Sequence, residues 1–134
     1  MRLAAIVLGL FGLVMVVAVA ACSSAGAEAP RTIAIRYSLF SEDFIEVKAG
    51  EPVTFELRNE DPILHEWIVG TLDVHNRHRT GTEPYHDEVP TEVSIPAYET
   101  RISTVTFDTP GYYPFICHLP GHEAYGMTGV IRVR

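Results

Sequence analysis

Apolar and polar residues alternate in short runs from about residue 31 to the C-terminus. Alternation with a period of two is the pattern of a strand that buries one face. We predict strands at Thr32–Leu39, Phe44–Val47, Val53–Arg58, His65–Val69, Glu92–Ile95, Ile102–Phe107, Tyr112–Cys117 and Thr128–Val133. No stretch keeps helical periodicity over three turns. The pattern therefore predicts an all-β domain.

Turn-forming residues separate most of these runs. They occur at Ala49-Gly50-Glu51-Pro52, Asn59-Glu60-Asp61-Pro62, Pro96-Ala97-Tyr98-Glu99 and Asp108-Thr109-Pro110-Gly111, where glycine and proline free or fix the backbone at a reversal. About eight short strands with such spacing favour an antiparallel β-sandwich with Greek-key connections. The polar segment Thr71–Pro90 is the exception, and we expect it to be a long loop.

The N-terminal segment is of a different kind, because no charged or strongly polar residue occurs between Leu3 and Ala21. The residues that end this run, Val19-Ala20-Ala21-Cys22, resemble the lipobox of bacterial lipoproteins, in which the chain is cut before the cysteine and its thiol carries lipid. The resemblance implies a signal peptide at 1–21, a lipid-bearing Cys22 at the membrane, a flexible tether over 22–30 and a folded domain at 31–134. An uncleaved transmembrane anchor is the alternative, because the run approaches the ~20 residues that span a bilayer. Both interpretations place the domain outside the cytoplasm, in the periplasm or on the outer face of the cell envelope.

Charge and cysteine content narrow the possible functions. The chain has a net charge of −7, and Arg2 is the only charged residue of the segment 1–21, so the acidic excess belongs to the domain. Nucleic acid is an unsuitable partner, since phosphate binding needs clustered Lys and Arg. With Cys22 assigned to lipid, Cys117 is the one cysteine left, so no disulfide can form within the domain. A lone thiol in an oxidising compartment suggests a bound metal.

The candidate chemistry lies near the C-terminus, in the segment YYPFICHLPGHEAYGMTGVIRV. Cys117, His122 and Met127 follow one another at a spacing of five in a loop between two predicted strands. A His₂Cys set with a weak axial Met is typical of electron-transfer copper. His65 is the best candidate for the second histidine, because it follows a predicted turn and opens an apolar strand.

These residues resemble the plastocyanin and azurin family of cupredoxins over most of 31–134. The resemblance implies one type 1 (blue) copper ion held by His65, Cys117, His122 and Met127, and transfer of single electrons between a donor and an acceptor protein. It also implies that His122 reaches the surface as the electron port and that Asn59 or Asp61 hydrogen-bonds the cysteine sulfur. We expect a monomer.

Two details of the motif bear on the subfamily and on the role. The Cys-x₄-His-x₄-Met spacing is similar to that of the rusticyanin and auracyanin branch. The segment HEWIVG, with a histidine-rich loop after it, resembles cupredoxin-like proteins linked to copper tolerance. Copper handling with the same fold therefore stays open as a second role.

The other histidines are expected to be bystanders. His75, His78 and His86 lie in the predicted polar loop, where solvated side chains are the simpler interpretation and a second, weaker metal site is the alternative. His118 follows the proposed ligand Cys117, and we expect it to point away from the copper because neighbours on an extended chain face opposite ways.

Rival classes of copper and zinc protein fit the sequence less well. Multicopper oxidases carry a His-Cys-His string, and here Ile116 replaces its first histidine, so we expect no enzyme activity. A binuclear copper centre needs a second cysteine in the loop. Structural zinc sites favour Cys and His without Met. The acidic charge suggests a redox partner with a basic docking patch.

Overall fold

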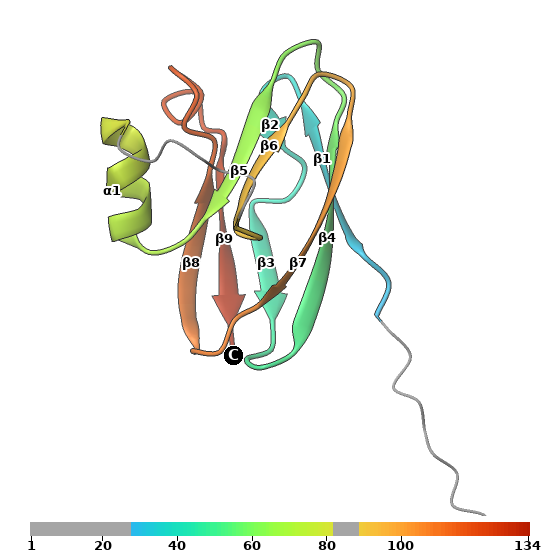
Figure 1. Ribbon diagram of the computed structural model, residues 1–134, viewed down its shortest axis with the longest axis vertical. Helices are drawn as coiled ribbons and strands as arrows, with labels where there is room; N and C mark the ends of the chain where they lie inside the picture. The colour runs from blue at the N-terminus through green and yellow to red at the C-terminus, as the bar shows by residue number, and fades with distance from the viewer. Residues whose placement is uncertain (1–27, 82–88) are drawn as a thin grey trace, which may run out of the picture.

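The computed structural model describes residues 28–81 and 89–134, which form a β-sandwich with one short helix (Figure 1). The strands within these residues are β1 (Arg31–Arg36), β2 (Leu39–Phe40), β3 (Phe44–Val47), β4 (Pro52–Asn59), β5 (His65–Val69), β6 (Glu92–Ile95), β7 (Thr100–Thr106), β8 (Gly111–Ile116) and β9 (Thr128–Val133), and the helix is α1 (Leu72–Thr80). In this part of the chain no helix is long and apolar enough to cross a membrane. The predicted signal peptide and Cys22 lie outside the described residues.

The strands form two sheets that pack face to face. One sheet has the order β2-β1-β4-β7 and the other the order β3-β9-β8-β5-β6. Buried side chains from both sheets form one core, in which the rings of Phe55 and Trp67 lie 4.9 Å apart. The predicted all-β sandwich is confirmed, and seven of the eight predicted runs coincide with strands to within two residues.

The expectation of purely antiparallel sheets is wrong for two strand pairs. β1 pairs with β4, and β3 pairs with β9, in parallel register, whereas the remaining pairs are antiparallel. The chain leaves the first sheet after β2, adds β3 to the second sheet and returns with β4. Alternation along a single strand reports which face is buried and carries no information about the direction of the neighbouring strand.

The first predicted strand, Thr32–Leu39, is broken by a tight turn. Tyr37 and Ser38 both adopt positive φ, at 54° and 55°, which reverses the chain into β2. The carboxylate of Asp61 accepts the backbone N–H groups of Tyr37 at 2.7 Å and Ser38 at 2.8 Å. A side chain more than twenty residues away thus stabilises a turn that contains neither Gly nor Asn, which local sequence does not predict.

The expectation of a loop over Thr71–Pro90 is also wrong in its first half, where α1 forms. Its buried residues are His75 and His78, so the face that packs against the sandwich contains polar residues that an apolar-periodicity test does not count. The helix ends at Gly81, which adopts the left-handed conformation at φ 70° and donates its N–H to the last-turn carbonyls.

Candidate metal centre

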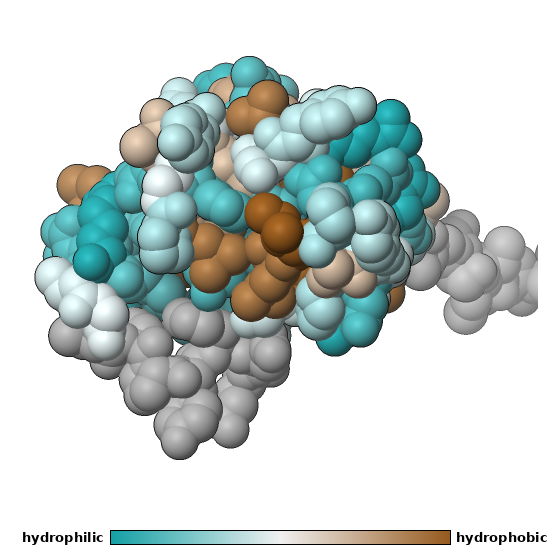
Figure 2. Space-filling model, turned by 90° about the horizontal axis from the view of Figure 1, so that it is seen from above, coloured by the Kyte–Doolittle hydropathy of each residue, from teal (hydrophilic) through white to brown (hydrophobic). Residues whose placement is uncertain are grey.

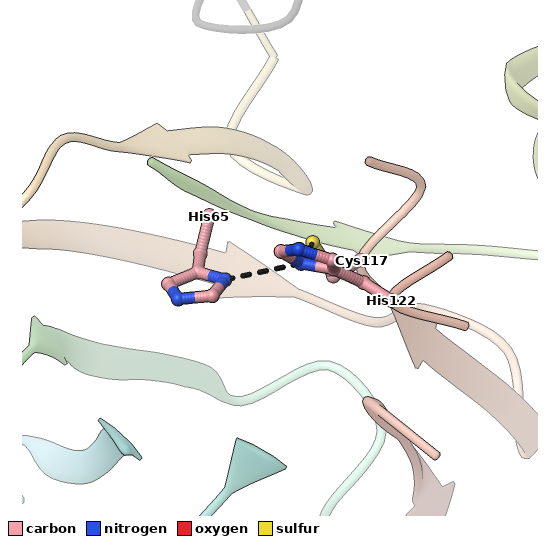
Figure 3. Close-up of side chains that lie close together, drawn as sticks. All are labelled: His65, Cys117 and His122. Carbon is pink, nitrogen blue, oxygen red and sulfur yellow. Dashed lines mark hydrogen bonds between the residues drawn. The ribbon is translucent and has the colours of Figure 1, made fainter. Parts of the chain in front are cut away.

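Three of the four proposed ligands converge at one end of the sandwich (Figure 3). His65 is the first residue of β5, Cys117 follows the last residue of β8, and His122 lies in the loop that leads to β9. His122 Nδ1 lies 3.3 Å from His65 Nδ1 and 3.3 Å from Cys117 Sγ. One ligand atom from each residue lies within 4.8 Å of the other two. The sequence therefore predicted a real cluster, formed by two segments more than fifty residues apart.

Met127, the fourth proposed ligand, directly precedes β9 at the end of the loop that contains Cys117 and His122, and it is fully buried. It belongs to the same buried set as Cys117, and the two residues are joined by a backbone hydrogen bond in which Cys117 N–H donates to Met127 O at 3.2 Å. His65 and Cys117 are also fully buried, whereas His122 is partly exposed. His122 is thus the group of this set that reaches the surface.

The ligand loop, residues 117–127, is held by its own backbone. His122 N–H donates to Leu119 O, and Met127 N–H donates to His122 O, both at 3.0 Å. Gly121 and Gly126 have φ values of 87° and 96°, a region that costs other residues energy. The loop is therefore a series of tight turns with a defined shape, which brings Cys117 Sγ and His122 Nδ1 to 3.3 Å from each other.

Asp61 fixes the orientation of His65. Asp61 Oδ2 lies 2.9 Å from His65 Nε2, and a carboxylate can only accept, so Nε2 carries the proton and Nδ1 offers its lone pair toward Cys117 and His122. Burial lowers the pKa of His65, against the opposing effect of Asp61. The imidazole is therefore neutral and ready to bind a metal at neutral pH.

Cys117 is buried as a thiol. Burial raises its pKa to about 11, although the N–H groups of Glu66 and Leu119 oppose this shift. The Glu66 N–H donates to Cys117 Sγ at 3.4 Å. The expectation that Asn59 or Asp61 would bind the sulfur is wrong: Asn59 Nδ2 instead lies within hydrogen-bond distance of the carbonyls of Ile63, Ile95 and Pro96, where it ties together the loops beside the site.

The expectation that the loop histidines are solvated is wrong for His75 and His78. His75 and His78 are buried on α1, while His86 lies outside the described residues. His118 does point away from the cluster: its Nε2 lies 2.9 Å from His75 Nδ1, and its ring stacks on that of His78. Within residues 28–81 and 89–134, the only group of three or more His, Cys, Asp or Glu side chains arranged for a metal is His65, Cys117 and His122.

Apolar side chains gather on the surface at the end of the sandwich that contains the cluster. Figure 2 looks onto this end of the sandwich and shows them near the middle of the face. Ile63 and Leu64, which precede His65, are 47% and 41% exposed, and Leu119 packs against the core beside Cys117. Ile63, Leu64 and Leu119, which flank the proposed ligands His65 and Cys117 in the chain, are called the apolar rim.

The donor set fits a copper ion. It offers two imidazole nitrogens, one buried thiol sulfur and one buried thioether, which is the combination of type 1 copper sites. Structural zinc sites combine Cys and His in a closed tetrahedron and do not use Met. A β-sandwich with these side chains at one end defines the class of mononuclear copper proteins of the cupredoxin type.

Comparison with known proteins gives the same result. The family model described as "Cupredoxin-like domain" matches residues 10–131, and the chain belongs to this family. It is similar to the copper-resistant cuproprotein CopI of Pseudomonas aeruginosa, at 29% identity over 71% of this chain and 70% of that protein. It is also similar to CopI of Rubrivivax gelatinosus, at 31% identity over 81% of this chain and 69% of that protein.

Solved structures confirm the fold. The reduced auracyanin of Roseiflexus castenholzii superimposes with a TM-score of 0.66, at 23% identity over 81% of this chain and 99% of that chain. Auracyanin A of Chloroflexus aurantiacus, described as a "blue" copper protein, superimposes with a TM-score of 0.58, at 25% identity over 79% of this chain and 100% of that chain.

Proposed function

We propose that this protein binds one type 1 copper ion through His65, Cys117, His122 and Met127 and carries single electrons. The observation that carries the proposal is the convergence of His65 Nδ1, Cys117 Sγ and His122 Nδ1 within 4.8 Å of one another in a preformed site, where His65 and Cys117 are buried and His122 is partly exposed. A preformed site needs little rearrangement between oxidation states, and that property makes one-electron exchange fast.

Each side chain has a distinct part in this proposal. Copper, when bound, supplies the one-electron Cu(I)/Cu(II) couple. Asp61 keeps His65 in the tautomer that presents Nδ1. Cys117 binds as the thiolate, and the Glu66 N–H stabilises the charge on its sulfur. His122, as the partly exposed ligand, offers the shortest route for an electron between the site and a docked protein.

Optical and paramagnetic spectra of the copper-loaded protein test the proposal. We expect an intense thiolate-to-Cu(II) absorption in the visible range, a small copper hyperfine splitting, and reversible bleaching on reduction. Cys117→Ser should remove the colour, whereas His78→Gln, a change at a buried histidine outside the cluster, should retain it. A colourless Cu(II) form of the wild-type protein would refute the proposal.

Copper handling is the second candidate, favoured by the similarity to two copper-resistant cuproproteins. A protein that delivers or sequesters copper must exchange the ion, while an electron carrier must retain it. Competition with a Cu(I) chelator separates them: release within seconds favours handling, and retention over hours together with fast electron self-exchange favours electron transfer.

Location and partners belong to the same proposal. A lipid on Cys22 would hold the domain on the extracytoplasmic side of a membrane, as a monomer, and the apolar rim together with the exposed part of His122 would dock a donor and then an acceptor protein. The net charge of −7 favours partners with a basic surface. Electron-transfer rates that do not change between low and high salt would argue against such charge steering. We propose no catalytic role, since Ile116 occupies the place of the extra histidine of oxidases.

A further inference from the structure

Helix α1 lies alongside β8 and the ligand loop (Figure 1). Its first connection to them is a chain of hydrogen bonds through His75, which is fully buried. His75 Nε2 lies 3.1 Å from Pro114 O on β8, and a carbonyl only accepts, so Nε2 carries the proton. His75 Nδ1 is then an acceptor, and the Nε2–H of His118 donates to it at 2.9 Å.

The second connection is ionic and lies one turn further along the helix. Arg79 Nε lies 2.9 Å and 3.2 Å from the two carboxylate oxygens of Glu123, and Arg79 Nη2 contacts the same carboxylate. This is the forked geometry in which Arg holds a carboxylate most firmly. Glu123 Oε2 also lies 3.7 Å from His118 Nδ1, so the two connections are adjacent, although neutral His118 with its proton on Nε2 donates no hydrogen bond to this carboxylate.

The residues held by α1 occupy special places in the loop. His118 directly follows the proposed ligand Cys117, and Glu123 directly follows the proposed ligand His122. Neither can move without moving the backbone of a ligand. On the opposite side of the cluster, His65 is held by Asp61. Within the described residues, α1 is the only helix or strand that bonds the side chains of His118 and Glu123.

We propose that α1 is a clamp on the ligand loop, in which His75 and Arg79 are positioning residues that hold Cys117 and His122 in place with and without the metal. The role of the clamp, which is to keep the site rigid during electron transfer and to slow the escape of copper, rests on the proposed function. Its existence as a mechanical constraint does not depend on copper and can be measured in the metal-free protein.

Two substitutions at His75 separate its two hydrogen bonds. In His75→Asn the side-chain oxygen occupies the place of Nδ1 and still accepts from His118. In His75→Gln the side-chain amide reaches the place of Nε2 and still donates to Pro114 O. Both variants remove the ring and keep one bond, but only His75→Asn keeps the connection to the loop.

Amide hydrogen exchange of the metal-free protein provides the first measurement. We expect the backbone N–H groups of His122 and Met127 to exchange about tenfold faster in His75→Gln, the factor that 1.4 kcal/mol gives, and within about twofold of wild type in His75→Asn. Arg79→Leu should speed the same amides. Arg101→Leu, which removes a comparable exposed pair between Arg101 and Glu99 at the start of β7, should leave the exchange of these amides unchanged.

Spectra and copper release of the copper-loaded protein provide the second measurement. His75→Gln and Arg79→Leu should shift the visible band, broaden the copper hyperfine lines and release Cu(I) to a chelator about tenfold faster, with His75→Asn close to wild type. Exchange and spectra unchanged in both His75→Gln and Arg79→Leu would overturn the clamp, as would equal effects of the two His75 variants. A wild-type protein without a type 1 spectrum would overturn the proposed function alone, because the exchange measurement would still decide on the clamp.

Discussion

Asp61 holds both the Tyr37–Ser38 turn and the ring of His65, and replacing it by asparagine tests how much these contacts stabilise the metal end of the sandwich. Its carboxylate accepts three hydrogen bonds: Oδ1 from the N–H of Tyr37, and Oδ2 from the N–H of Ser38 and from His65 Nε2. Asparagine has one acceptor oxygen and one donor nitrogen in the same volume. Whichever way the amide turns, its NH₂ group faces at least one N–H donor.

The cost follows from this count. The most favourable orientation keeps the two bonds on the Oδ2 side and loses the bond to Tyr37. Hydrogen bonds to a charged group contribute about 1.5–3 kcal/mol and neutral ones about 0.5–1.5 kcal/mol, so one lost and two weakened bonds amount to roughly 3 kcal/mol. In a domain of this size that corresponds to a Tm lower by about 10–20 °C.

Urea unfolding of the metal-free Asp61→Asn variant measures the effect. Burial would raise the pKa of Asp61, but the N–H groups of Ser38 and Tyr37 and the contact with His65 bring it below its ordinary value of 3.8. The stabilisation is therefore complete at neutral pH and is lost as the pH falls below 3.8, so the gap between wild type and variant should narrow only there. Glu42→Gln, at an exposed carboxylate, should leave the midpoint unchanged. A variant within 0.5 kcal/mol of wild type, on the ordinary scale of surface changes, would show that the three bonds do not stabilise the fold.

Three further predictions concern the proton on the thiol, the packing of β9 and the buried histidines. Because the pKa of Cys117 is raised to about 11, binding of Cu(II) to the metal-free protein at pH 8 should release about one proton per ion; an indicator dye in weak buffer measures this, and Cys117→Ser should release none. A Cβ at Gly129 would lie 2.1 Å from the Phe115 ring, so Gly129→Ala should cost about 1–3 kcal/mol in urea unfolding, whereas at Gly111 the nearest atom is 3.6 Å away and Gly111→Ala should be tolerated; equal midpoints would contradict the close packing. Burial lowers the pKa of His75, and that of His118 to about 4, so the unfolded chain binds more protons and the metal-free fold should lose roughly 3 kcal/mol from His118 alone between pH 6.5 and 4. His118→Gln should flatten this profile in unfolding experiments at successive pH values, and an unchanged slope would contradict it.

The sequence was informative wherever one segment contains its own signal. The strands were predictable because alternation is local, and the ligand loop was predictable because Cys117, His122 and Met127 lie within eleven residues of one another. His65 was found as a residue that opens a strand after a turn, and the structure places it 3.3 Å from His122. These positions depend only on periodicity and on the chemistry of the donor set.

What the sequence did not reveal depends on contacts between distant segments. The turn at Tyr37–Ser38 exists because Asp61 accepts two of its N–H groups. Helix α1 packs through histidines whose partners, Pro114 and His118, lie about forty residues away. One local signal could have been used for Asp61: it precedes His65 by four residues, and an acidic residue near a candidate metal-binding histidine suggests a carboxylate–histidine pair.

The supports around the site bear on the choice between the two proposed roles, because electron transfer and copper exchange make opposite demands on the ligand loop. An exchanging site must open, so at least one ligand should lie on a segment with few constraints. Here Asp61 holds His65, and the backbone of Glu66 and Met127 holds Cys117. Helix α1 holds the loop, because His75 bonds His118 and Arg79 bonds Glu123. The partly exposed His122 is the one ligand that solvent or a chelator can approach, and its successor Glu123 is tied to the helix. Such a site favours retention of the metal, and therefore the electron carrier, unless a partner first releases α1.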